Sequence, residues 1–130
     1  MDAERHARAE DHPRAVVQLV ETLAVGGAEQ LAVRIANGRA RQGHPSFVYV
    51  LGEGGPLERR IDPAVGVRRL GVRRASITNP LRFLASLRGG RRVLRDQLAR
   101  DGARIVQSHL PNANFWGLLL EVSGDARSVP

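Results

Sequence analysis

Residues 16 to 44 run from a short apolar stretch through two adjacent glycines into a longer amphipathic segment, VVQLVETLAVGGAEQLAVRIANGRARQGH. The apolar stretch, Ala15 to Leu23, is short and rich in Val and Leu, as is typical of a strand buried on both faces. From Ala28 to Gln42, apolar side chains including Leu31 recur at three- and four-residue spacing before Gly43, which predicts a helix. This strand–turn–helix order indicates the start of a βαβ unit.

The same alternation continues to the end of the sequence. We predict further strands at 46–52, 65–72 and 104–110, helices at 81–103 and 113–124, one helical turn within 53–62, and the start of a fifth strand at 126–130. Asn79 is the expected N-cap of the long helix, Pro80 its first residue and Gly102 its stop signal, while Gly89 and Gly90 are expected to kink or split it. Strands alternating with helices imply right-handed crossovers, so the fold class is α/β: a Rossmann-like parallel sheet with helices on both faces.

The amino-acid composition limits the reactions and partners that are open to this chain. The sequence has no cysteine and no lysine, which excludes disulfides, thiol nucleophiles and Schiff bases. Its net charge of +7 favours acidic partners, although an Arg-rich solvated surface explains the charge equally well. Residues 1–14 are polar and mixed in charge, so we expect a flexible tail before a single domain at 15–130. No run approaches the ~18 apolar residues that span a bilayer, and we therefore expect a cytoplasmic protein.

The turn after the first strand is a favoured ligand position in such sheets. Gly26 and Gly27 lie there, and the free N–H groups of the following helix can bind an anion. A tight turn without ligand is an equally good interpretation. The dinucleotide motif G-x-G-x-x-G and the P-loop motif are both missing, and Glu29 in the first helical turn has a structural role by default.

Several features together resemble the N-terminal half of family 4 glycosyltransferases, which have the GT-B fold. They are G-G-A-E after the first strand, R-Q-G-H before the second, and a strand ending in His109 followed by N-A-N at residues 112–114. The resemblance covers roughly residues 15 to 130 in the expected order.

This resemblance implies a retaining sugar transferase that uses a nucleotide sugar as donor substrate and needs no other cofactor and no metal. It places Gly26, Gly27 and Glu29 near the donor phosphates and the acceptor, and it makes His109 a candidate catalytic residue or acceptor ligand, with Asn112 and Asn114 beside it. In the family the donor nucleotide is held mostly by a C-terminal domain that carries a pair of Glu residues. We expect this chain alone to be inactive, and to work with a C-terminal domain on another chain if it is one half of a split enzyme.

Two alternatives stay open. A non-enzymatic α/β module, flavodoxin-like or receiver-like, would share the fold class, but a receiver needs an acidic cluster after its first strand, where Glu21 leads into glycines. The Arg-rich segment 81–100 suggests peripheral contact with the inner face of an anionic membrane, against the simpler interpretation of a solvated helix face. Nucleic-acid binding is disfavoured because no aromatic residue is interleaved with the Arg runs.

Overall fold

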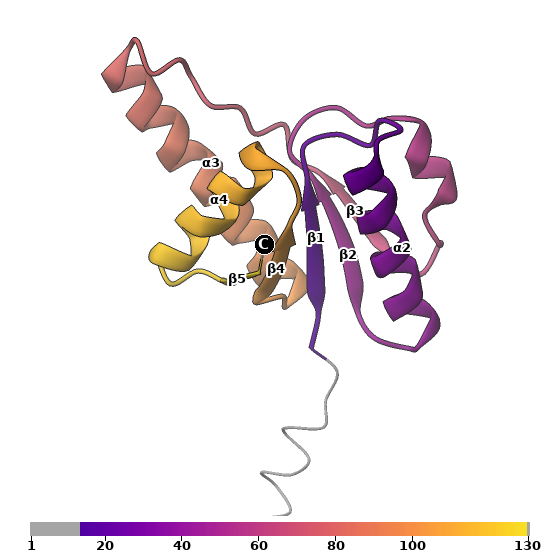
Figure 1. Ribbon diagram of the computed structural model, residues 1–130. Coiled ribbons are helices and arrows are strands. Elements are labelled where there is room, and N and C mark those ends of the chain that lie inside the picture. The colour runs from indigo at the N-terminus through magenta and orange to yellow at the C-terminus, as the bar shows by residue number, and fades with distance from the viewer. Residues whose placement is uncertain (1–13, 130) are drawn as a thin grey trace, which may run out of the picture.

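A computed structural model describes residues 14–129, which form five strands, three α-helices and one 3₁₀ helix (Figure 1). The elements follow one another as β1 (Val16–Val20), α2 (Gly27–Arg41), β2 (Ser46–Val50), η1 (Pro56–Arg60), β3 (Gly66–Arg69), α3 (Pro80–Asp101), β4 (Ile105–Ser108), α4 (Pro111–Val122) and β5 (Arg127–Val129). The α/β prediction is confirmed, with strands a few residues shorter than expected. The tail predicted for residues 1–14 lies, apart from Arg14, outside the described residues.

The sheet is parallel throughout and has the strand order β3-β2-β1-β4-β5. β1 is central: Val17 pairs with Phe47 of β2 on one side and with Val106 of β4 on the other. The chain leaves β1 toward β2 and β3, then returns through α3 to β4, so the strand order reverses between β1 and β4. Loops diverge at such a switch point and leave a crevice at the carboxyl ends of the strands.

Two apolar cores cover the two faces of the sheet, as expected for helices on both sides (Figure 1). α2 packs on one face, where Ala32, Val33 and Ala36 are buried against Val48 and Val50. Leu31, which the spacing placed on this buried face, is instead 52% exposed, because α2 turns its 32, 33 and 36 positions to the sheet.

The opposite face carries the larger core, which α3 and α4 cover. Its largest members are Trp116 of α4 and Tyr49 of β2, both at most 1% exposed. Trp116 fits against α3 at Gly90, where an added Cβ would come within 2.8 Å of Trp116 Cζ3 and of Val72 Cγ1. Gly90 is therefore required for the close approach of α3 and α4.

α3 begins and ends as predicted: the Asn79 side chain accepts a hydrogen bond from the Arg82 N–H at 3.2 Å, and Gly102 ends the helix with φ of 64°. The expected split at the glycine pair is wrong, because α3 runs unbroken from Pro80 to Asp101. Arg91, the residue that follows the glycine pair, forms an ion pair with Asp125 at 2.7 Å.

The last turn of α3 is tied to the sheet by Asp101, whose side chain is 6% exposed. Its carboxylate accepts hydrogen bonds from Tyr49 Oη at 2.5 Å, Arg68 Nη2 at 3.0 Å and Gln97 Nε2 at 3.0 Å. Burial alone would raise the pKa of Asp101, but these donors outweigh it and lower the pKa. This cluster fixes α3 to β2 and β3 at the amino edge of the sheet.

Candidate functional site

The glycine turn opens α2 at the carboxyl end of β1. Gly26 is the N-cap, in an extended conformation and without a capping side chain, and Gly27 is the first helical residue. A Cβ at Gly27 would meet nothing within 4 Å, so the chain there borders open space. The first N–H groups of the helix have no partners within it and carry the positive end of its dipole.

Glu29 folds back toward this helix start. A Cβ at Gly26 would collide with the carboxylate of Glu29, so the absence of a side chain at Gly26 makes room for that of Glu29. A negative charge at a helix N-terminus is stabilising, and here the Glu29 carboxylate lies beside the turn at Gly26.

His109 lies just beyond β4, beside the glycine turn. Its Nε2 is 2.8 Å from Oε1 of Gln18, a side chain of β1 that is fully buried. With a carbonyl oxygen as partner, Nε2 carries the proton and Nδ1 keeps its lone pair. Burial lowers the pKa of His109, while the nearby charge of Glu29 raises it part of the way back. The ring is therefore neutral at pH 7.

The connection from β4 to α4 makes an unusual turn at Leu110, which has a φ of 73° and is 45% exposed. A positive φ is costly for a branched apolar residue, about 1–3 kcal/mol, and such strain often accompanies function. Beyond it, Asn114 accepts a hydrogen bond from Ser108 Oγ at 2.7 Å and ties α4 to the end of β4. This hydrogen bond engages the Oδ1 atom of Asn114.

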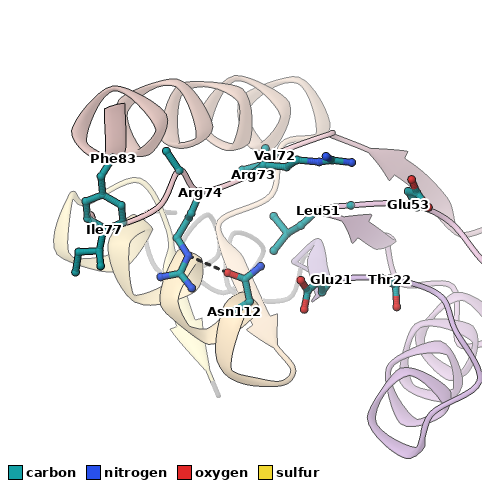
Figure 2. A pocket seen from close by; sticks show the side chains of 12 residues that line it. Glu21, Thr22, Leu51, Glu53, Val72, Arg73, Arg74, Ile77, Phe83 and Asn112 are labelled. Atoms are coloured by element: carbon teal, nitrogen blue, oxygen red, sulfur yellow. Dashed lines mark hydrogen bonds between the residues drawn. The ribbon is translucent and has the colours of Figure 1, made fainter. Parts of the chain in front are cut away.

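A pocket of about 810 Å³ opens at the same edge of the sheet, on the face covered by α3 and α4 (Figure 2). Leu51 and Val72, both buried, belong to its lining. The other lining residues come from the ends of β1 and β2, the β3–α3 connection and the starts of α3 and α4: Glu21, Thr22, Gly52, Glu53, Arg73, Arg74, Ala75, Ile77, Phe83 and Asn112.

Arg74 is held in place inside this pocket. Its Nε donates a hydrogen bond to Asn112 Oδ1 at 3.1 Å (Figure 2). Its Cζ lies 4.3 Å from the centre of the Phe115 ring. The cation–π contact and the hydrogen bond together restrict the guanidinium. Asn112 therefore positions the Arg74 side chain in the pocket.

The predicted site residues divide into two groups on either side of the end of β1. Gly26, Gly27, Glu29 and His109 gather on the α2 side, and none of them lines the pocket. Asn112 lies in the pocket on the other side. Gln18 and Arg74 were not predicted from the sequence, although a Gln inside an apolar strand and a pair of Arg residues after a strand end were available signals.

Among residues 14–129 no three His, Asp or Glu side chains are grouped so as to hold a metal ion. No described helix is long and apolar enough to cross a membrane.

The sequence matches the model of one protein family, and the fold is similar to that of a solved structure. Residues 25–129 match the family model described as Glycosyltransferase Family 4. The chain superposes on the crystal structure of a glycosyltransferase from Rickettsia africae ESF-5 with a TM-score of 0.64 and 14% sequence identity, a likeness of fold. That match covers 89% of this chain and 28% of the other. No curated protein sequence matches the chain.

Proposed function

Because this chain belongs to glycosyltransferase family 4, we propose that it forms the acceptor-side half of a retaining transferase, which moves a sugar from a nucleotide-sugar donor to an acceptor. The observation that carries the proposal is the glycine turn at the switch point between β1 and β4, facing open space at Gly27. Backbone N–H groups at such a helix start suit the phosphates of a donor.

His109 is the residue proposed to contact the reacting acceptor. Gln18 holds Nε2–H, which leaves the lone pair of Nδ1 free to accept a hydrogen bond from an acceptor hydroxyl. A lowered pKa keeps this acceptor unprotonated at neutral pH. Gln18 is a positioning residue in this arrangement.

We propose that the chain supplies one wall of the cleft and that a C-terminal domain supplies the other. The chain spans 28% of its structural neighbour, and one wall cannot close on a substrate or exclude water. The isolated chain is expected to transfer no sugar. Transfer by the purified chain from any nucleotide sugar would contradict this proposal.

The test of the glycine turn is a titration of the ¹⁵N-labelled chain with UDP, GDP and ADP, followed by NMR. We expect amide shifts at Gly27, Ala28 and Glu29. Gly27→Val fills the open space in front of the turn and should abolish binding, whereas Gly38→Ala, near the C-terminal end of α2 with equally open space, should leave it unchanged. Undisturbed amides at the turn, or equal binding by Gly27→Val, would refute the proposal.

We also propose that α3 contacts an anionic membrane. A hollow of about 370 Å³ lies among Arg88, Arg91, Arg92 and Arg95 on this helix. Toward its N-terminal end α3 exposes Leu81 and Leu84, so charged and apolar groups share one helix. The protein should sediment with liposomes rich in anionic lipid at low salt and be released at high salt; failure to bind at low salt would refute membrane contact.

A further inference from the structure

Charge is unevenly distributed around the pocket at the carboxyl edge. Arg73 and Arg74 enter it from the β3–α3 connection, and Glu21 and Glu53 from the ends of β1 and β2 (Figure 2). We propose that this pocket selects an acceptor that is a polyol phosphate, and that Arg74 binds its phosphate group. The inference rests on the proposed function only in treating the ligand as the acceptor.

The Arg74 side chain is already ordered in a position from which it can bind a phosphate group. Its Nε is engaged by Asn112 and its guanidinium carbon lies over the Phe115 ring, so the side chain loses little freedom on binding. Its terminal amino groups make no hydrogen bond to any residue between 14 and 129. Two parallel N–H groups of an arginine match two phosphate oxygens in one plane.

The pocket arginines also lack neutralising partners. In the described part of the chain, neither Arg73 nor Arg74 forms an ion pair. Four other arginines do pair with carboxylates: Arg68, Arg69, Arg91 and Arg95. The buried Leu51 and Val72 beside the pocket keep water from one side, which strengthens the attraction of an arginine for an anion.

The acidic side of the pocket determines the orientation of the ligand. Glu21 and Glu53 are exposed and line the pocket near Thr22. Carboxylates accept hydrogen bonds from hydroxyl groups and repel phosphate, so a polyol phosphate would direct its phosphate to Arg74 and its hydroxyls to the end of β1. That end of β1 continues into the glycine turn, where the donor is proposed to lie.

The test compares glucose 6-phosphate with glucose in NMR titrations of the chain. We expect glucose 6-phosphate to shift the amides of residues 73–75 and 112, and glucose to bind at least about tenfold more weakly. Arg74→Gln should weaken binding of glucose 6-phosphate by at least about tenfold. Arg100→Gln, an exposed arginine in the last turn of α3 outside the pocket, should leave binding unchanged. Circular dichroism checks that each variant is folded.

A second arm identifies the source of the phosphate. Dihexanoyl phosphatidylglycerol, a soluble lipid, should compete with glucose 6-phosphate if the natural acceptor is a lipid headgroup, and should fail to compete if it is a soluble polyol phosphate; both results support the site. Equal binding of glucose and glucose 6-phosphate, or equal losses in Arg74→Gln and Arg100→Gln, would overturn it. Nucleotide titrations that leave Gly27 undisturbed would refute the proposed function without affecting this result.

Discussion

Replacing Gly90 with alanine places a methyl group between α3 and α4 in the larger core. Its carbon would lie closest to Trp116 Cη2, and 2.8 Å from Trp116 Cζ3 and from Val72 Cγ1. Carbon atoms pack at about 3.5 Å or more, so Val72 must retreat by about 0.7 Å and Trp116 by more than that. Trp116 is fully buried and Val72 is 6% exposed, and close-packed neighbours yield poorly. Such overpacking costs about 1–3 kcal/mol.

Gly89 offers a matched control in the same helix, because a Cβ there meets nothing within 4 Å. Alanine gains about 1 kcal/mol over glycine in a helix interior at either position. Gly89→Ala should therefore raise the free energy of unfolding by about 1 kcal/mol, while Gly90→Ala should change it by about 0 to −2 kcal/mol. The difference between the variants isolates the overpacking.

Urea unfolding measures this difference, with the fluorescence of Trp116, the single tryptophan, as the probe and circular dichroism as a second signal. If Gly90→Ala proved as stable as Gly89→Ala, the reasoning on the contact between α3 and α4 would be refuted.

Two further predictions concern charge. Asp101→Asn should lower the free energy of unfolding at pH 7 by about 1–2 kcal/mol, a value reduced by the exposure of Arg68. Folding lowers the pKa of Asp101, so the stabilisation from its charge is present above the unfolded pKa of ~4 and is lost as the pH falls through the lower folded pKa. In urea unfolding, the free energies of the variant and the original chain should therefore converge as the pH falls below ~4, and a constant gap would argue against the network. Glu29→Gln removes the charge that raises the pKa of His109, so an NMR titration should show that pKa falling further, and an unchanged or higher value would contradict their proximity. The same substitution should tighten nucleotide binding at the glycine turn, where the Glu29 carboxylate competes with a phosphate.

The fold was predictable because each element leaves a local signal in the sequence. Short apolar runs gave the strands, and the cap of α3 follows from Asn79 and Pro80 at adjacent positions. Errors arose where tertiary contacts decided the outcome. Gly90 allows Trp116 to pack closely against α3, and the helix continues through it without a break. Arg91 pairs with Asp125, which lies 34 residues further along the chain.

The position of the candidate site could be predicted from the sequence, but only some of the residues that form it could be. Topology places any ligand of a parallel sheet at the carboxyl ends of the strands, so the glycine turn and His109 were natural candidates. The partners that prepare the site are distant in sequence: Gln18 lies 91 residues from His109, and Arg74 lies 38 residues from Asn112. No local pattern reports such pairs, and the family resemblance does not name them.

The cluster around Asp101 fastens only one end of α3. The buried positions of this helix, Gly90, Leu94 and Leu98, lie from its midpoint onward, while its N-terminal turns project beyond the sheet (Figure 1). Backbone amides near Leu98 should therefore exchange with deuterium slowly, close to the rate set by global unfolding, and those near Leu81 much faster, by local fraying. Phe83, near the N-terminal end of α3, lines the pocket, so opening of these turns would change the pocket on that side, while Asn112 and Phe115 keep Arg74 in place.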